Sequence, residues 1–172
     1  MFQRNSHCIR IAPIALLVLA VTQSCPAAFK EGDRLHALNS FNLEGKLPDK
    51  LKGQVILLDF WASWCGPCKK SFPAMQDLHT QYAAQGLTII AVSVDENSED
   101  MKRFLKAANV SFSTLRDGGQ KLVAVADVAT MPTSFLIDRA GKIRFLHKGF
   151  LGNETVEQYH DEIKRLLKEP AP

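Results

Sequence analysis

The sequence predicts an α/β fold in which helices flank a central mixed β-sheet, and its apolar segments are the reason. Val55 to Phe60 and Leu87 to Val94 are apolar runs of the kind found in strands buried on both faces. A segment with helical periodicity connects them, so we expect two parallel strands joined by a crossover helix. Ser134 to Asp138 and Ile143 to His147 are separated by the turn sequence of residues 139–142, which predicts an antiparallel hairpin. Together these strands make a mixed sheet.

Further helices are expected around this sheet. Helical signals begin at Ser98, cover residues 121–128, and start again at Asn153, which we expect to cap the last helix. Pro73 lies inside the first helix and predicts a kink there. Leu38 to Leu43 alternates apolar and polar residues before a turn signal, so we expect an N-terminal β-hairpin extension.

Residues 1–27 have the pattern of an export signal. Two arginines precede Ile11 to Val21, an apolar run of eleven residues that is shorter than the about 20 residues a transmembrane helix needs. Cleavage after Ala27 would leave one domain over residues 28–172, located in the periplasm. An uncleaved membrane anchor and a lipoprotein lipidated at Cys25 are the alternatives.

Charge argues against a nucleic-acid partner. The chain has 21 basic residues, and removing the two arginines of the expected signal leaves 19 against 18 acidic ones. No basic patch interleaved with aromatic residues is present in the sequence, as nucleic-acid binding would require.

The cysteines indicate redox chemistry. Of the four, Cys8 and Cys25 lie in the expected signal, so the mature chain would keep only Cys65 and Cys68. A disulfide between residues this close in sequence closes a small loop and stabilises a fold little. The pair therefore predicts a thiol–disulfide oxidoreductase whose only redox group is the Cys65–Cys68 disulfide, with no other cofactor.

The two thiols have different expected roles. Cys65 lies where the helix begins, and the positive end of the helix dipole favours its thiolate, so we assign it as the nucleophile. Pro67 suits the first helical turn. Cys68 lies one turn further along, where it is more shielded, and is assigned as the resolving thiol.

Asp59 is the exception in its apolar strand. Burial would raise the pKa of its carboxyl group, so we expect Asp59 to take a proton from Cys68, through water. The alternative is a solvated or hydrogen-bonded carboxylate at the strand end. Trp64 is a candidate for the surface that a partner touches, whereas Trp61 fits the core. The local sequence alone predicts a trans bond before Pro132, because most X–Pro bonds are trans.

The segment from Phe60 to Lys69, FWASWCGPCK, preceded by Asp59 and followed by Pro73, resembles the thioredoxin active site. With the export signal and the segment MPTSFLID, residues 131–138, the chain is similar to the TlpA/ResA/DsbE-like branch of bacterial thioredoxin-fold proteins over about residues 32–167.

This resemblance implies a thioredoxin fold and several site residues. Pro132 would be a cis-proline facing the disulfide, and the backbone of Met131 would pair with a substrate strand. Asp59 would be the buried acid of thioredoxins. We expect Trp64, Gly66 and Pro67 to contact the substrate together with Met131.

The resemblance also implies partners. Members of this branch work outside the cytoplasmic membrane and keep target thiols reduced, often in apocytochrome c during cytochrome c maturation or in copper-site proteins. They receive electrons from a membrane carrier of the DsbD/CcdA type. The Gly66-Pro67 dipeptide is that of thioredoxin itself and favours a general reductase, which we expect to be a monomer.

Two other functions use the same cysteines. A peroxiredoxin-like peroxidase shares the fold, but Cys65 lacks the Thr-x-x-Cys pattern of that family. A metallochaperone could hold Cu(I) on the two thiols, although no second Cys pair is present to complete a zinc site. A passive structural disulfide is the simplest alternative.

Overall fold

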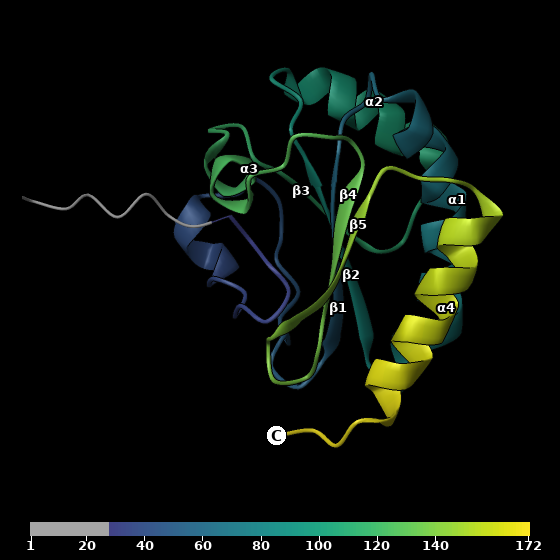
Figure 1. The fold of residues 1–172 in the computed structure, drawn as a ribbon. Coiled ribbons are helices and arrows are strands. Elements are labelled where there is room, and N and C mark those ends of the chain that lie inside the picture. Colours follow the sequence, from purple (N-terminus) through teal and green to yellow (C-terminus); the bar gives the residue numbers. More distant parts are fainter. Residues whose placement is uncertain (1–27) are drawn as a thin grey trace, which may run out of the picture.

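Strand β1 (Val55–Trp61) lies at the centre of the sheet, and all seven of its residues are buried. The computed structural model describes residues 28–172, so the expected signal and the lipidation site at Cys25 lie outside the described residues. The five strands run in the order β3-β2-β1-β4-β5 (Figure 1). The other strands are β2 (Leu87–Ser93), β3 (Ser113–Arg116), β4 (Thr133–Ile137) and β5 (Ile143–Lys148).

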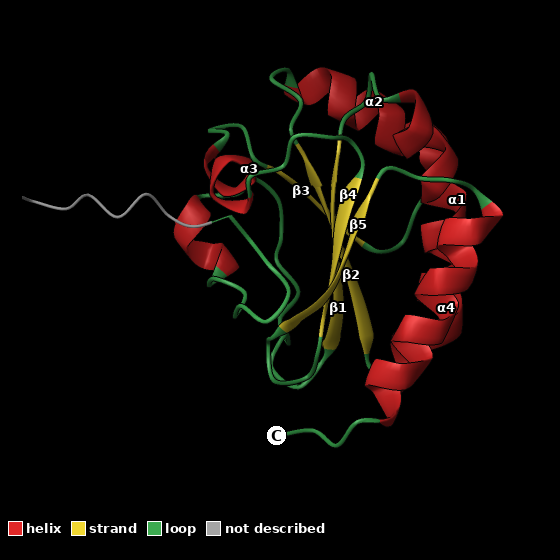
Figure 2. Cartoon of the chain, in the orientation of Figure 1, coloured by secondary structure: helices red, strands yellow, loops and turns green. Residues whose placement is uncertain are grey.

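Strands β1, β2 and β3 are parallel, whereas β4 pairs antiparallel with β1 and β5 antiparallel with β4. The predicted mixed sheet is therefore confirmed. The helices are α1 (Gly66–Tyr82), α2 (Ser98–Ala108), α3 (Lys121–Ala126) and α4 (Asn153–Lys168), with 3₁₀ turns η1 (Leu38–Phe41) and η2 (Ala83–Gln85). Helices α1 and α4 lie on one side of the sheet, and α3 and η1 lie on the other (Figures 1 and 2). This is the thioredoxin fold that the sequence predicts.

Within residues 28–172, no helix has the length and apolar character that crossing a bilayer requires.

The alternation of side chains along β1 decides what lies on each side of the sheet. The Trp61 ring packs on Phe72 of α1, with 4.6 Å between ring centroids. Phe60 points to the other face, where its ring meets Phe135 at 6.1 Å. Because side chains two residues apart in a strand share a face, Asp59 lies on the same side as Trp61 and helix α1.

The expected β-hairpin over residues 38–43 is wrong. Residues Leu38–Phe41 form η1 instead, and Asn42 ends it in the left-handed conformation with φ 52°. The backbone of the extension pairs with the main domain rather than with itself, through isolated bridges from Arg34 to Lys142 and from Glu44 to Arg116. Alternating apolar residues therefore mark contacts with the domain here, with Leu38 buried against it.

Two helix boundaries also differ from expectation. Asn153 is the first residue of α4 rather than its N-cap residue. The N-cap position is held by Gly152, which has no side chain with which to cap the helix. The short helix α3 ends at Ala126, before the predicted residue 128, because Asp127 adopts a left-handed conformation with φ 53°. Helix α1 continues through Pro73 to Tyr82, and the kink there stays a prediction.

Leu57 tests how far stability depends on β1. Its side chain is fully buried in the central strand, so Leu57→Ala should lower the free energy of unfolding by about 2–5 kcal/mol through lost burial and the cavity left behind. The matched control is Leu151→Ala at a side chain that is 71% exposed, which should change stability by less than about 0.5 kcal/mol. Urea denaturation of the two variants measures both, and equal effects would contradict the assigned core.

Candidate active site

Cys65 and Cys68 form a disulfide at the start of α1, with their Cα atoms 5.3 Å apart. Cys65 is the N-cap residue of the helix, and Pro67 follows in its first turn, as the sequence predicts. The backbone N–H of Cys68 donates to the sulfur of Cys65 over 3.1 Å. Cys65 is 5% exposed and Cys68 is fully buried. A helix start that aims an N–H group at the more accessible sulfur is suited to stabilise a thiolate there.

The residues expected to contact substrate surround this disulfide. Trp64 is 70% exposed, and Gly66 and Pro67 are exposed next to it. Met131 is half-buried, and the bond from Met131 to Pro132 is cis, as the resemblance implies and against the trans bond that the local sequence predicts. Trp64 and Met131 line the same surface hollow, so the loop before β4 is brought beside the disulfide loop.

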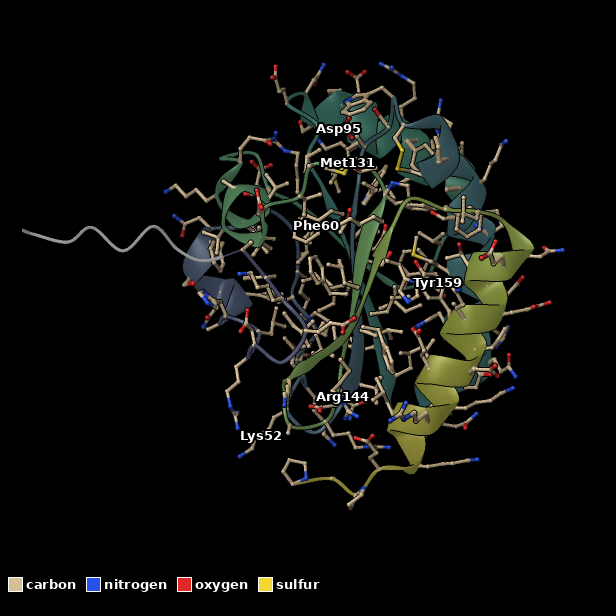
Figure 3. All side chains as sticks on the ribbon, viewed as in Figure 1. Lys52, Phe60, Asp95, Met131, Arg144 and Tyr159 are labelled. Carbon is tan, nitrogen blue, oxygen red and sulfur yellow. A yellow bond between two sulfur atoms is a disulfide. The ribbon has the colours of Figure 1, made fainter. Side chains whose placement is uncertain are left out.

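Asp95 holds the loop that precedes Cys65, a role that the sequence reasoning missed. Its carboxylate accepts from the backbone N–H of Ser63 at 3.0 and 3.1 Å and from the Ser63 hydroxyl at 2.8 Å. The hydroxyl of Ser93 donates to the same carboxylate over 2.7 Å. Asp95 and Met131 lie at the same end of the sheet (Figure 3). A polar residue directly after an apolar parallel strand was the available signal.

Asp59 lies within the sheet and is 1% exposed. The hydroxyl of Ser134 donates to Asp59 Oδ1 over 2.6 Å, while Asp59 Oδ2 is buried with no hydrogen-bond partner. Burial raises the pKa of Asp59 to about 7, and the hydrogen bond from Ser134 partly opposes that rise. Of the two forms of the alternative, the solvated carboxylate is wrong because Asp59 is buried, whereas a hydrogen-bonded carboxyl group is what the structure shows, at one oxygen.

Ser134 and Tyr159 were also missed by sequence reasoning. Ser134 is the cross-strand partner of Asp59, and its hydroxyl lies 2.7 Å from the phenolic oxygen of Tyr159 on α4. Tyr159 lies between α4 and the sheet (Figure 3). Burial, and then the charge of Asp59, raise the pKa of the Tyr159 phenol. No local signal marks Ser134, because it follows Thr133 at the polar start of strand β4.

Metal ligands do not gather around the disulfide. In the part of the chain that the structure describes, no group of three or more His, Cys, Asp or Glu side chains is placed to hold a metal ion.

The fold, the Cys65–Cys68 pair at a helix start and the cis-proline beside it define a thioredoxin-fold thiol–disulfide oxidoreductase. The family model described as AhpC/TSA family matches residues 18–146. The chain belongs to the ResA-like thiol–disulfide oxidoreductases within this family.

Relatives and solved structures agree with this assignment. The chain is 38% identical to the thiol-disulfide oxidoreductase ResA of Bacillus anthracis over 128 residues, which cover 73% of this chain and 72% of that protein. It is 35% identical to ResA of Bacillus subtilis over 114 residues, 66% of this chain and 64% of that protein. A candidate thiol:disulfide interchange protein DsbE from Chlorobium tepidum superposes with a TM-score of 0.74 at 38% identity, over 81% of this chain and 99% of that one. StoA from Bacillus subtilis superposes with a TM-score of 0.57 at 29% identity, over 64% of this chain and 84% of that one.

The buried carboxyl group makes a prediction about stability and pH. Asp59 has a pKa of about 7 in the fold against 3.8 for the ordinary group, so between these values the native protein holds a proton that the unfolded chain has lost. Raising the pH through this window therefore destabilises the native state, by about 4 kcal/mol in total, and Asp59→Asn removes that loss.

Urea unfolding of the oxidised protein at pH 4 to 8 measures this effect. As the pH rises, the free energy of unfolding of Asp59→Asn should increase relative to that of the wild type. The matched control is Asp49→Asn, whose side chain is 85% exposed and which should follow the wild-type pH dependence. A constant difference between wild type and Asp59→Asn across the range would contradict the raised pKa.

Proposed function

We propose that this thiol–disulfide oxidoreductase works as a reductase, passing two electrons from the Cys65 and Cys68 thiols to disulfides of other proteins. The observation that carries the proposal is the asymmetry of the pair: Cys65 is the N-cap residue and the more exposed of the two, with the Cys68 N–H donating to its sulfur. A thiolate at this position can attack an incoming disulfide, while Cys68 stays shielded until a mixed disulfide has formed.

In the first step the Cys65 thiolate attacks one sulfur of the substrate disulfide. A bond forms between Cys65 Sγ and that sulfur, the substrate S–S bond breaks, and the second substrate sulfur leaves as a thiolate that is protonated by water. The product is a mixed disulfide between the two proteins, with Cys68 still a thiol.

In the second step Asp59 acts as the base. Its carboxylate takes the proton of the Cys68 thiol, directly or through one water, and the Cys68 thiolate attacks Cys65 Sγ. The Cys65–Cys68 disulfide forms, the mixed disulfide breaks, and the substrate leaves with both sulfurs reduced. A pKa of about 7 supports this role, since the group can both accept and return a proton near neutral pH, and Asp59 shares the α1 side of the sheet with Cys68.

The substrate would lie over the hollow that Trp64 and Met131 line. The exposed Trp64, Gly66 and Pro67 supply the contact surface around Cys65, and the backbone of Met131 would pair with an extended substrate segment beside Pro132. No cofactor beyond the Cys65–Cys68 disulfide is required by these steps.

The export signal expected in residues 1–27 supports a setting outside the cytoplasmic membrane. We place the protein in the periplasm, as a monomer that is reduced again by a membrane carrier of the DsbD/CcdA type. The Gly66-Pro67 dipeptide supports a general reductase of protein disulfides, with apocytochrome c maturation and copper-site proteins as the narrower possibilities.

Variants of the two cysteines test the reaction. With a thiol reductant, the wild type should reduce insulin disulfides, and Cys65→Ser should lose this activity completely because no nucleophile remains. Cys68→Ser that has been reduced and then freed of the reductant should form the mixed disulfide and stop there, so a covalent adduct with substrate accumulates and is seen by non-reducing electrophoresis. Release of reduced substrate by Cys68→Ser in the absence of added reductant would contradict the two-thiol mechanism.

The same preparations separate the competing functions. Consumption of hydrogen peroxide faster than insulin reduction would favour a peroxidase, and tight binding of one Cu(I) ion by the reduced protein would favour a metallochaperone. For a reductase we expect neither rapid peroxide consumption nor tight Cu(I) binding.

A further inference from the structure

The Asp59 carboxyl group is joined to α4 by two hydroxyl groups. Ser134 donates to Asp59 Oδ1 over 2.6 Å and lies 2.7 Å from the hydroxyl of Tyr159. The exposed fractions are 1% for Asp59, 1% for Ser134 and 2% for Tyr159, so water does not replace these contacts. The three side chains come from β1, β4 and α4, and they form one buried polar chain.

The surroundings of Asp59 make this chain its main support. The two strand partners of Asp59 are Ser134 on β4 and Ala91 on β2, and alanine offers no polar side chain. Within residues 28–172, no basic side chain forms an ion pair with Asp59. A buried carboxyl group without a cation depends on hydrogen-bond donors for its ionised form.

Chemistry fixes the direction of the hydrogen bonds. An ionised carboxylate only accepts, so the single proton of the Ser134 hydroxyl is used on Asp59 Oδ1. The Ser134 oxygen must then accept, and the proton that lies between Ser134 and Tyr159 belongs to the phenol. The chain therefore runs from Tyr159 to Ser134 to Asp59, and the first hydrogen bond strengthens the second.

The remaining oxygen has a different environment. Asp59 Oδ2 is buried without a hydrogen-bond partner, whereas Oδ1 is already engaged. A proton that arrives at Oδ2 leaves both hydrogen bonds of the chain in place, whereas a proton at Oδ1 would force the hydroxyl groups to turn around. The arrangement thus selects one oxygen for proton exchange.

We propose that Ser134 and Tyr159 are positioning residues that hold Asp59 Oδ1 and so leave Oδ2 to exchange the proton of the Cys68 thiol. The proposal rests on the function proposed above, because it gives the buried acid a mechanism only if Asp59 is the base for Cys68. It adds two residues on β4 and α4 to a site otherwise built from β1, α1 and the loop before β4.

The nearest titratable group outside this chain is His147 on β5, which is the cross-strand partner of Ser134 and also contacts Tyr159. The ring of His147 on β5 packs edge-on against the Tyr159 ring at 4.9 Å, and His147 Nε2 lies 2.7 Å from a carboxylate oxygen of Glu162 on α4. On the α1 side, the group that exchanges a proton with Asp59 is Cys68. The pH profile of proton transfer should therefore follow Asp59, with His147 and Glu162 as the nearest outer charges.

The test is the pH dependence of the resolution step. A mixed disulfide with a thiol reporter is formed at Cys65, and release of the reporter by Cys68 is followed in a stopped-flow instrument from pH 5 to 9. Removal of a donor raises the pKa of Asp59, so Ser134→Ala should move the half-maximal pH upward. A rise of about one unit in the pKa of Asp59 would lower the ionised fraction of Asp59 at pH 7 from about one half to about one tenth, and the rate of reporter release would fall about fivefold.

Tyr159→Phe should move the profile in the same direction by less, because it removes the second donor and leaves the first. Ser134→Thr keeps a hydroxyl group and should return the profile toward wild type. The matched control is Tyr82→Phe, which removes the hydroxyl of another buried tyrosine, bonded to His160 Nδ1 at 2.8 Å, and should leave the profile unchanged.

The outcomes distinguish the positioning role of Ser134 and Tyr159 from the proposed role of Asp59 as the base for Cys68. If Asp59→Asn slows resolution but Ser134→Ala and Tyr159→Phe match wild type, the positioning role is overturned and the proton relay stands. If Asp59→Asn itself leaves the profile unchanged, both are overturned. Circular dichroism melting checks that each variant is folded. If Ser134→Ala does not fold, the test depends on Tyr159→Phe: a pH profile of Tyr159→Phe that coincides with the profile of Tyr82→Phe overturns the proposal.

Discussion

The site depends on one carboxyl group that is buried without a compensating cation. An unpaired carboxylate in a protein interior is costly, and Asp59 avoids much of that cost by holding a proton up to a pKa of about 7. The hydroxyl of Ser134 offsets part of the remaining cost at one oxygen, and the other oxygen has no partner. A purely structural residue at this position would be expected to be apolar, so the cost points to a task.

The fold brings this group and the disulfide together through one continuous segment. Strand β1 carries Asp59 near its end, the loop held by Asp95 follows, and α1 begins at the Cys65–Cys68 pair. The same helix start that stabilises a thiolate at Cys65 turns Cys68 toward the interior. Under the proposed mechanism, Cys65 is the thiol that attacks the partner's disulfide, and Cys68 is the thiol that gives its proton to Asp59.

The sequence was sufficient for the elements that depend on local patterns. The apolar run over residues 55–60 predicted a buried central strand, and the Cys65 and Pro67 positions predicted a helix start, because periodicity and capping act within a few residues. The hydrogen bond from Ser134 to Asp59 joins residues 75 apart, and that from Tyr159 joins α4 to β4, so neither has a local signal. The prediction of a hairpin over residues 38–43 was wrong because a local pattern was produced by non-local contacts: the apolar residues of this segment pack on the main domain instead of marking a strand.

The most direct measurement of the central claim is the ionisation of Asp59 itself. Carboxyl ¹³C resonances of the oxidised protein, with Asp59 identified by comparison with Asp59→Asn, can be followed by NMR from pH 3 to 9. A midpoint near 7 is predicted from burial without a cation. A midpoint near the ordinary value of 3.8 would contradict a buried acid that exchanges protons with Cys68 at neutral pH.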